Sequence, residues 1–445
     1  MNILFIAYQF PPLNVGGSHR PLMFAKYLPE YGITPTIITL DQRDYSVVYT
    51  KVNRDNNQLK ELSDDTHICQ VKSDNLIRKR SNRFISRFPE FFNEAYYWRK
   101  DFYKKISILV SKKKYDAIFV TAPPFSILKL AKKTSKKFDV PLIVDLRDHW
   151  SLWMTTPYKS YLHYLLVKNS EKRVLQAAES IITTSLVTQS DLIKHHPSIR
   201  KSKFNYIPNG FDNQILENEK IVFNTKYEIN IGYVGSFYYD PESRDMMFKE
   251  TKKKTLLKKL QYTPRKEDWL YRSPYFFLKT IKQIIKNNPD FKNRIKISFA
   301  GKKENWLLQM VDDFGLSDIV NHVGWLDKQQ SVEFQKKCDF LLLTSSKVIN
   351  GKDYSIAGKT FEYLKLLKPV LGFVTNSAQK DLLEQLGNSL LLDPDDHIES
   401  SKKLEQVFNQ NTEFILNKKF AKQFERKKQT QQLAQIIKSC NKRYH

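Results

Sequence analysis

The stretch Tyr354-Ser355-Ile356-Ala357-Gly358-Lys359-Thr360-Phe361-Glu362-Tyr363-Leu364 decides the interpretation of the whole chain. It follows a short apolar run at 340–344, whose length and flanking serines predict a buried strand. Apolar residues at helical spacing then predict a helix that begins near Gly358 or Lys359 and ends before Pro369, because proline cannot continue a helix. The apolar run at 370–374 predicts the next strand.

This order of strand, loop, helix and strand places Lys359 and Glu362 at the carboxyl edge of a parallel sheet, where ligands of such sheets collect. A helix start attracts phosphate, Lys359 adds a positive charge, and Glu362 can accept two hydrogen bonds from a ribose diol. A nucleoside diphosphate fits these three features. An ordinary surface helix with a Lys–Glu pair three residues apart has the same spacing, so the spacing alone leaves both interpretations open.

The segment Gly358-Lys359-x-Phe-Glu362-Tyr363-Leu, followed by Lys368-Pro369-Val, resembles the donor-binding segment of family 4 glycosyltransferases of the GT-B fold, of the type that builds bacterial surface polysaccharides. The resemblance implies an α/β fold with two Rossmann-like domains that face each other across a cleft, and a C-terminal helix that returns to the N-domain. It also implies a retaining transfer from a nucleotide-sugar donor. Gly358, Lys359 and Thr360 would lie at the diphosphate, and Glu362 would hold the ribose.

The composition of the chain agrees with a two-domain globular protein. Its 445 residues can bury two cores. The three cysteines are far apart and lack a C-x-x-C pattern, which argues against disulfides or a zinc site. We expect no metal and no cofactor. No apolar run reaches the roughly 20 residues of a membrane-spanning helix, and the N-terminal run is too short for a signal peptide. We therefore expect a cytoplasmic protein.

The formal net charge of +26 implies an anionic partner. Residues 72–114 interleave thirteen Lys and Arg and only four acids with aromatic residues, which suits the surface of an anionic membrane and predicts a peripheral location at its inner face. The alternative is a helical hairpin that uses these aromatic residues as core. No recognisable nucleic-acid module accompanies the charge, so nucleic acid is not an expected partner. The interleaved apolar residues are Phe84, Ile85, Phe88, Phe91, Phe92, Tyr96, Tyr97, Trp98 and Phe102.

The N-terminal residues predict a βαβ unit, with strands at 2–7 and 34–40 and a helix at 18–31. The loop before the helix contains Gly16 and Gly17, which let backbone N–H groups approach an anion, although a tight turn explains them equally well. The G-x-G-x-x-G spacing of a dinucleotide site is absent. The segment Pro-Pro-x-x-x-Gly-Gly-Ser-x-Arg20 is similar to the family's N-domain glycine loop, which implies that Gly16 and Gly17 face the donor diphosphate.

A predicted strand at 140–146 delivers Arg147, Asp148, His149 and Trp150 to the carboxyl edge of the first sheet. The resemblance implies an acceptor-side catalytic role for Arg147 and Asp148, although many relatives carry histidine near the position of Arg147. A structural ion pair of Arg147 with Asp148 or Asp145 is the alternative. His149 is either an acid/base or, more simply, a polar surface residue.

The Asn209-Gly210 turn marks the domain boundary implied by the resemblance. We expect an N-domain at 1–210, a nucleotide-sugar domain at 211–416 with a basic insertion at about 241–271, and a basic C-terminal helix at 417–445. An apolar stripe on that helix would pack back on the N-domain. The stripe consists of Phe420, Phe424, Leu433 and Ile437.

The second domain opens with a strand at 229–234 that ends in Gly235 and Ser236, which in relatives approach the donor phosphates. Two basic candidates follow. Arg272, in Arg-Ser-Pro, resembles the phosphate-binding arginine of close relatives, and Arg244 with Lys249 matches the spacing of more distant ones. We favour Arg272. Together with Lys359 it would neutralise the leaving diphosphate, so that no metal is required.

Two further positions bear on the donor. Gly324 and Trp325 correspond to a turn near the nucleotide base, where we expect Gly324 to offer backbone contacts and Trp325 to serve mainly in packing. Tyr354 stands where relatives carry the first acid of a Glu-x7-Glu pair that contacts the transferred sugar, and Asp353 is its neighbour.

The sequence thus predicts a nucleotide-sugar-dependent, metal-independent glycosyltransferase. Its acceptor would be a hydroxyl of a lipid-linked or growing surface glycan such as capsule or lipopolysaccharide. The alternative is a non-catalytic protein of the same fold that binds a glycan or a protein partner.

Overall fold

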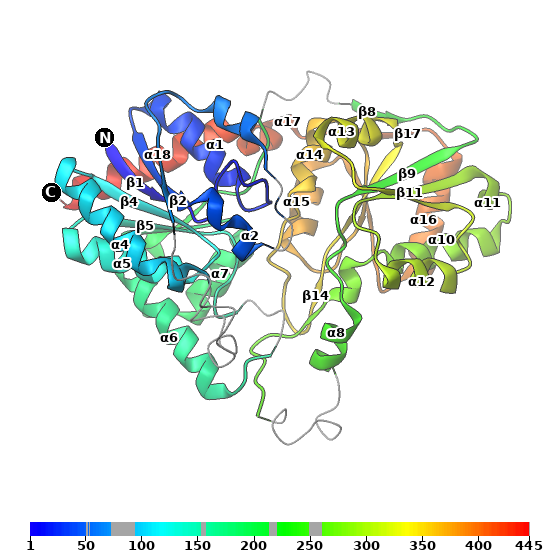
Figure 1. Ribbon diagram of the computed structural model, residues 1–445. Coiled ribbons are helices and arrows are strands. Elements are labelled where there is room, and N and C mark those ends of the chain that lie inside the picture. Colours follow the sequence, from blue (N-terminus) through cyan, green and yellow to red (C-terminus); the bar gives the residue numbers. More distant parts are fainter. Residues whose placement is uncertain are drawn as a thin grey trace. The chain divides into compact units, whose positions relative to one another are not determined.

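The computed structural model describes residues 1–49, 52, 54–72, 94–152, 157–212, 220–248 and 260–444. The chain forms two compact units, and each is built on its own parallel sheet with helices on both faces (Figure 1). The first unit contains residues 1–153, 159–209 and 426–445, and the second contains residues 154–158 and 210–425. The predicted α/β class with two Rossmann-like domains is confirmed.

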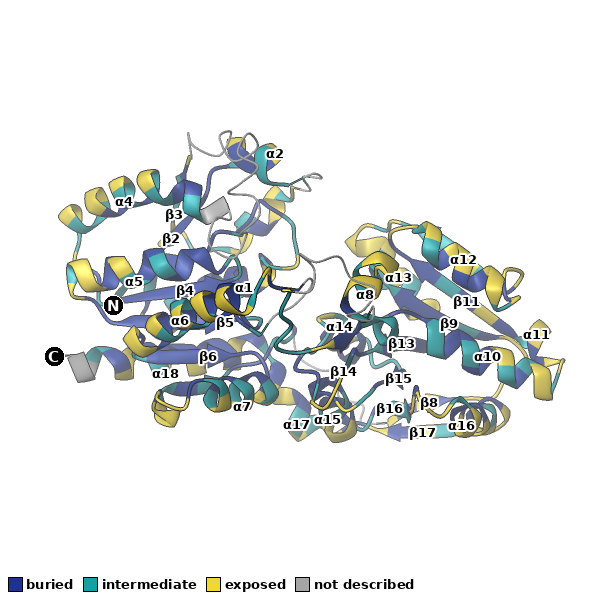
Figure 2. Cartoon of the chain, turned by 90° about the horizontal axis from the view of Figure 1, so that it is seen from below, coloured by how far each residue is buried: buried dark blue, intermediate teal, exposed yellow. Residues whose placement is uncertain are grey.

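The first unit has a seven-stranded sheet with the order β3-β2-β1-β4-β5-β6-β7. All neighbouring strands are parallel, and the order reverses beside β1, as in a doubly wound fold. The central strands are buried on both faces, which explains their unbroken apolar runs (Figure 2). The strands are β1 (Asn2–Ile6), β2 (Thr34–Leu40), β3 (His67–Val71), β4 (Ala117–Ala122), β5 (Leu142–Leu146), β6 (Ser180–Thr183) and β7 (Phe204–Tyr206).

Helices cover both faces of this sheet. The helices α1 and α18 lie side by side on one face, and α4, α5 and α6 follow one another on the other (Figure 1). The predicted first helix is interrupted, because Pro29 converts its end into a 3₁₀ turn at Leu28–Tyr31. The α-helices are α1 (His19–Tyr27), α2 (Tyr45–Val48), α4 (Glu94–Lys112), α5 (Ser126–Phe138), α6 (Tyr161–Ala177), α7 (Leu186–His195) and α18 (Arg426–Tyr444).

The aromatic residues predicted to contact a membrane are core residues where the structure describes them. Tyr97, Trp98 and Phe102 of α4 are buried, and the Trp98 indole N–H donates a hydrogen bond of 2.8 Å to the Val71 carbonyl. Tyr96 is half-buried. The membrane interpretation is therefore wrong for Tyr97, Trp98 and Phe102, and the core alternative is right. Phe84, Ile85, Phe88, Phe91 and Phe92 lie outside the described residues.

The second unit has a six-stranded parallel sheet with the order β12-β11-β9-β13-β15-β16. The predicted strands on either side of the Lys359 helix are both present and pair with each other as β13 and β15. The strands of the sheet are β9 (Ile229–Val234), β11 (Ile295–Ala300), β12 (Val320–Gly324), β13 (Phe340–Thr344), β15 (Val370–Phe373) and β16 (Ser389–Leu392).

Two short antiparallel pairs complete the strands of this unit: β8 (Lys220–Phe223) with β17 (Thr412–Ile415), and β10 (Glu267–Asp268) with β14 (Lys347–Val348). The strand β10 and the helix α8 lie within the predicted insertion at 241–271, so the described part of the insertion is structured. The α-helices are α8 (Pro241–Phe248), α10 (Tyr275–Asn287), α11 (Phe291–Arg294), α12 (Asn305–Asp313), α13 (Lys328–Lys337), α14 (Lys359–Lys365), α15 (Ala378–Leu386), α16 (His397–Asn409) and α17 (Lys418–Ala421).

The C-terminal segment serves both units rather than forming one continuous helix. Phe424 belongs to the second unit, where its ring lies 5.3 Å from that of Phe361. After Glu425, which has extended backbone angles, α18 begins and places Leu433 and Ile437 in the core of the first unit. The expected return of the last helix to the N-domain is confirmed. Among the described residues, no helix has both the length and the apolar character needed to cross a membrane.

Candidate functional site

Three glycines line the carboxyl edge of the second sheet. Gly235, Gly301 and Gly324 lie at the ends of β9, β11 and β12, which are neighbours, and all three have positive φ angles of 107°, 151° and 84°. The Gly301 N–H donates to the Gly324 carbonyl at 2.7 Å, and a Cβ atom on Gly301 would lie only 2.4 Å from the Gly235 oxygen. The close packing of backbone at this edge requires glycine at 301, whereas a Cβ atom on Gly324 would meet no other atom within 4 Å. The sequence analysis did not identify Gly301 as a site residue.

Lys359 lies against this glycine edge at the first position of α14. Its ammonium nitrogen is 3.6 Å from the centroid of the Tyr233 ring and 3.4 Å from where a Cβ of Gly235 would lie. Burial lowers the pKa of Lys359 to about 7, and the nearby Glu362 carboxylate only partly opposes this. Among the described residues, Lys359 forms no ion pair. A partly desolvated lysine without an anion is suited to receive one.

The loop before α14 is fixed by a buried glutamine. The Gln379 side-chain oxygen accepts hydrogen bonds of 2.9 Å from the Ala357 N–H and from the Thr360 hydroxyl. The Thr360 side chain is thus buried and directed into the protein. Gly358 and Glu362 are exposed, and a Cβ atom on Gly358 would meet no other atom within 4 Å.

Arg272, at the end of a 3₁₀ turn (Trp269–Arg272), lies beside the same sheet edge. Its guanidinium donates to the Ser355 hydroxyl at 2.5 Å and lies 3.6 Å from the Asp353 carboxylate. Its carbonyl oxygen accepts a hydrogen bond of 3.0 Å from Thr344, at the end of β13. Burial raises the pKa of Tyr233, and the charge of Arg272 partly opposes this shift.

The rival arginine, Arg244, is engaged elsewhere. Its guanidinium binds both carboxylate oxygens of Asp268 at 2.7 and 2.8 Å, and this pairing raises the pKa of Arg244. Its proposed companion Lys249 lies outside the described residues. The local geometry therefore favours Arg272 over Arg244 as the group that meets a donor phosphate.

Two buried acids lie behind Arg272. Asp353 is fully buried and accepts hydrogen bonds of 3.0 Å from the backbone N–H groups of Ser346 and Ser355. Glu267, carried by β10 of the insertion, is 3% exposed and accepts a hydrogen bond of 3.0 Å from the Trp269 indole. Burial, and after it the charge of Asp353, raises the pKa of Glu267. Both acids hold the loops around Arg272 in place.

Tyr354 is buried as well. Its side chain is 4% exposed, and its ring lies beneath the guanidinium of Arg265, at 5.3 Å from the ring centroid. Neither Tyr354 nor Asp353 presents a side chain to solvent where relatives would present the first acid.

Two further residues of the predicted donor site are Ser236 and Trp325, the neighbour of Gly324. Trp325 is 69% exposed, so the expectation that it serves in packing is wrong, and its ring is accessible for stacking. Ser236 is half-buried, and its carbonyl oxygen accepts a hydrogen bond of 3.0 Å from the Tyr233 hydroxyl.

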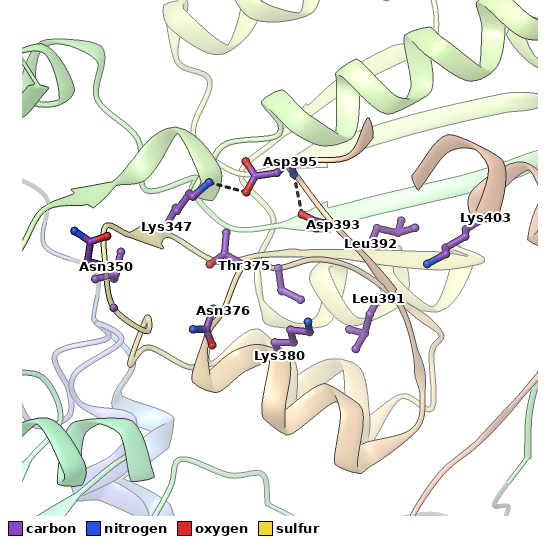
Figure 3. Close-up of a pocket in the computed structure, with 13 residues that line it drawn as sticks. Lys347, Asn350, Thr375, Asn376, Lys380, Leu391, Leu392, Asp393, Asp395 and Lys403 are labelled. Atoms are coloured by element: carbon purple, nitrogen blue, oxygen red, sulfur yellow. Dashed lines mark hydrogen bonds and ion pairs between the residues drawn. The ribbon is translucent and has the colours of Figure 1, made fainter. Parts of the chain in front are cut away.

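A cavity of about 670 Å³ opens elsewhere in the second unit, beside β14 and the carboxyl ends of β15 and β16 (Figure 3). Lys347 at its border is bound to Asp395 at 2.6 Å, while Lys380 and Lys403 extend from two helices. None of the predicted donor residues that the structure describes lines this cavity. The described residues that were predicted to bind the donor therefore lie outside this cavity.

In the first unit, Arg147 joins three loops at the carboxyl edge of the sheet. Its guanidinium donates to the Gly17 carbonyl at 2.5 Å, to the Gln9 side chain at 3.3 Å and to the Pro123 carbonyl. Burial lowers its pKa, and Asp148 and Asp145 oppose this shift. A Cβ atom on Gly17 would lie 1.9 Å from the Gln9 oxygen and 2.5 Å from Arg147, whereas Gly16 is exposed with open space around it. These contacts make Arg147 a positioning residue for the glycine loop.

The Arg147–Asp145 ion pair, which the sequence left open as an alternative, is not among the ion pairs of the described residues. The fully buried Asp145 instead pairs with Arg20, at 2.8 and 3.1 Å, and accepts a hydrogen bond of 2.7 Å from Thr121. Arg20 also donates to the carbonyl oxygens of Ile207 and Pro208. This network ties α1 to β5 and to the end of the first unit's main segment.

His149 and Ser151 contact polar side chains of α6 and α7. His149 is fully buried, with its Nε2 3.6 Å from an Asp191 carboxylate oxygen, so the surface interpretation is wrong. Next to it, the Ser151 hydroxyl donates to Glu171 and lies 2.9 Å from the His195 Nε2. Asp148 is half-buried at the edge of the sheet.

This anchoring cluster has the residue types of a metal site. The donor atoms of Glu171, His195 and His196 all lie within 4.8 Å of one another. They are hydrogen-bonded within the cluster, with 2.9 Å between His196 Nε2 and the Glu171 carboxylate. Burial lowers the pKa of His195 to about 4, so its ring is neutral. Sequence reasoning missed this cluster, for which the adjacent histidines were the available signal.

Residues 16–214 match the family model "Glycosyltransferase Family 4". The sequence matches no curated protein.

Solved structures similar to this chain share its two-unit fold. They include sucrose-phosphate synthase from Thermosynechococcus elongatus, with a TM-score of 0.55 and 12% identity over 99% of this chain and 96% of that one. The lipopolysaccharide outer core galactosyltransferase WaaB in its apo form has a TM-score of 0.55 and 10% identity over 99% of both chains. HepE of Anabaena, in complex with UDP-glucose, has a TM-score of 0.50 and 13% identity over 100% of this chain and 98% of that one. At these identities the likeness shows the fold.

Proposed function

We propose that the protein transfers a sugar from a nucleoside-diphosphate donor to a glycan hydroxyl, with retention of configuration, and the match of residues 16–214 to the model of Glycosyltransferase Family 4 supports this proposal. The observation that carries this proposal is the position of Lys359 at the glycine-lined end of β9, with Arg272 beside the end of the neighbouring strand β13. Lys359 contacts Tyr233 and Gly235, and Arg272 is fixed beside the end of β13.

The two cations would act on the leaving group. In the transfer, the bond between the sugar C1 and the phosphate oxygen breaks, and its electron pair goes to the diphosphate. Arg272 and Lys359 would stabilise this developing charge in a partly desolvated site, where such interactions are strongest. Because both charges come from the protein, the reaction would not require a metal ion.

The remaining proposed contacts with the donor are assigned to residues whose side chain or backbone is exposed. Glu362 is exposed one turn along α14 from Lys359, which suits a carboxylate that accepts hydrogen bonds from the ribose diol. Gly235, Ser236 and Gly301 would offer backbone to the phosphates, and Gly324 with the exposed Trp325 would contact the base. We assign Tyr354, Asp353 and Thr360 to support of the loops, because all three side chains are buried.

The acceptor would be a lipid-linked or growing surface glycan, such as a capsule or lipopolysaccharide precursor, at the inner face of a membrane. The net charge of +26 supports an anionic surface as a partner. On the acceptor side, Asp148 is the candidate for contact with the substrate, whereas Arg147 and Gly17 shape the loop beside it.

One observation favours the non-catalytic alternative, a protein of this fold that binds a glycan or partner without turnover. The position of the first acid is occupied by the buried Tyr354, and its neighbour Asp353 is also buried. Titration calorimetry with UDP and GDP, followed by donor hydrolysis with each binding nucleotide-sugar, separates the two functions. Binding without turnover on any donor and acceptor would establish the alternative.

The central test is a thermal-shift screen with nucleoside-diphosphate sugars, since a ligand that binds the folded protein raises its melting temperature. For the stabilising donor, Glu362→Gln should weaken binding about tenfold and reduce discrimination against the 2′-deoxy nucleotide. Glu384→Gln, an exposed acid on α15, is the matched control and should bind normally. If no donor stabilises the protein, or if Glu362→Gln binds as tightly as the wild type, the assignment of this site fails.

A further inference from the structure

The helix α6 exposes an apolar surface in its first two turns. Its buried residues, among them Tyr164, Val167 and Val174, recur along one face. The opposite side exposes four large apolar residues, which are Tyr161 (54%), Leu162 (66%), Leu165 (38%) and Leu166 (53%). Further along the same side the exposed residues are polar. A surface helix normally keeps this side polar throughout, so the apolar half marks an interaction surface.

The helix α6 and its neighbour α5 also carry many basic residues. The helix α5 lies beside α6 (Figure 1), and its lysines at 133, 136 and 137 are exposed. Residues 126–138 contain no acid, and the only acid among residues 157–178 is Glu171, which is fully buried. Basic residues also flank the apolar side chains on α6 itself. They are Lys159, Lys168, Lys172 and Arg173.

The basic residues of the two helices are close enough to affect one another. Burial lowers the pKa of Lys132, and the charges of Arg173 on α6 and Lys136 on α5 lower it further. Acids follow only at the ends of the two helices, at Asp139 and Glu179, so the helices carry an excess of positive charge, which favours contact with an anionic surface. We use the name α5–α6 surface for the four exposed apolar residues of α6 together with the neighbouring basic residues. These basic residues are Lys133, Lys136, Lys137, Lys159, Lys168, Lys172 and Arg173.

The combination of apolar and basic groups distinguishes among partners. A nucleic acid would use the lysines but would gain nothing from exposed leucines. A second copy of this chain could cover the leucines, but it would bring another net charge of +26 and the same basic helices. An anionic bilayer satisfies both groups, because acyl chains receive the apolar side chains while lipid phosphates receive the cations.

We propose that the α5–α6 surface docks this protein on an anionic membrane, with the first turns of α6 lying in the interface. Tyr161 and the three leucines would enter the boundary between headgroups and acyl chains, and the lysines of α5 would contact the phosphates. This inference rests on the proposed function only in that a lipid-linked acceptor would bring the enzyme to a bilayer. The docking itself requires no turnover.

The test is co-sedimentation of the full-length protein with phosphatidylcholine vesicles, with or without phosphatidylglycerol, at physiological salt. We expect binding only when the anionic lipid is present. Leu162→Ser/Leu166→Ser should lower the partition coefficient at least tenfold, and Lys136→Gln/Lys137→Gln should lower it severalfold. The matched control is Val222→Ser/Ile415→Ser, which changes two exposed apolar residues (52% and 64%) on β8 and β17 and should leave binding unchanged. Circular dichroism should show that all variants remain folded.

The other outcomes overturn the proposal. They are absence of binding to anionic vesicles, equal binding to neutral ones, or equal loss in the control variant. Self-association that Leu162→Ser/Leu166→Ser abolishes, with no change in vesicle binding, would assign the surface to a second copy. Donor binding, measured by calorimetry without vesicles, should be unaffected by the α6 variants. The variant Lys359→Gln should lose donor binding but still bind vesicles. Failure of the donor site can therefore be distinguished from failure of the docking surface.

Discussion

The ammonium group of Lys359 lies 3.6 Å from the centroid of the Tyr233 ring, at the carboxyl end of β9. This contact places a positive charge on an aromatic face in a partly desolvated site, where the lysine has no ion pair among the described residues. The arrangement stabilises the cation less than water would, and burial accordingly lowers the pKa of Lys359 to about 7.

Donor affinity should fall as the pH rises above about 7. A bound diphosphate favours the charged ammonium and raises the pKa of Lys359 in the complex, so binding takes up a proton in that range. The dissociation constant should increase by up to about tenfold per pH unit until the pKa of the complex is reached. Calorimetry with the stabilising nucleotide-sugar, in buffers of different ionisation enthalpy, measures both the affinity and the proton uptake.

The control for this prediction is Lys359→Gln, which should bind weakly and with a flat pH profile. A wild-type dissociation constant that does not change between about pH 7 and 9, or the same slope in the variant, would contradict the role of Lys359.

Lys359→Met should raise the melting temperature near neutral pH. The folded protein holds the pKa of Lys359 below that of the unfolded chain, so burial of the ammonium group lowers the stability fully below about pH 7 and progressively less up to about pH 10. Replacing the lysine removes this cost, and the gain should shrink as the pH rises from about 7 to 10. Calorimetric unfolding at several pH values tests it. A lower melting temperature of Lys359→Met at neutral pH would contradict the assigned cost.

Substitution of Arg272 should lower activity, whereas substitution of Arg244 should affect mainly stability. Arg272→Gln should lower kcat/KM by about 10² to 10³, as expected for loss of one group that stabilises a developing charge. Arg244→Gln removes the bidentate partner of the buried Asp268, so it should lower stability by about 1–3 kcal/mol but leave donor binding intact. Steady-state kinetics and thermal unfolding of both variants separate these effects. A larger kinetic loss in Arg244→Gln would reverse the assignment.

The two adjacent glycines of the first unit provide a matched pair. Gly17→Ala forces a Cβ atom to within 1.9 Å of the Gln9 oxygen and 2.5 Å of Arg147, and should destabilise the protein by about 1–3 kcal/mol. Gly16→Ala meets no atom within 4 Å and should be nearly neutral. Denaturant unfolding measures the stability of both variants. Equal stabilities would contradict the close contact of Arg147 and Gln9 with Gly17.

Removal of divalent metal should not abolish transfer. Two protein cations, Arg272 and Lys359, are placed to neutralise the diphosphate, which is the role that a metal ion has in other transferases. Initial rates measured after dialysis against EDTA should stay within about twofold of the untreated enzyme. Loss of activity that added Mg²⁺ or Mn²⁺ restores would show that the two side chains are insufficient.

Much of the fold could be predicted from local sequence. The apolar runs at 340–344 and 370–374 are short and bounded by serine or proline, and they form the paired strands β13 and β15. Lys359 begins the intervening helix, as the spacing predicted. The prediction of a continuous C-terminal helix was wrong, because Phe424 packs in the second unit whereas Leu433 packs in the core of the first.

The sequence alone determined the two parallel sheets, the helix that starts at Lys359 and the basic character of the chain, because these follow from local periodicity and composition. Only the tertiary structure decided which charged groups are available. It buried Asp353 and Tyr354, tied Arg244 to Asp268, bound Arg147 to backbone carbonyls and left Trp325 and the first turns of α6 exposed. The burial and pairing of a side chain depend on segments that are distant in the sequence. The local sequence around a residue therefore does not identify its partners.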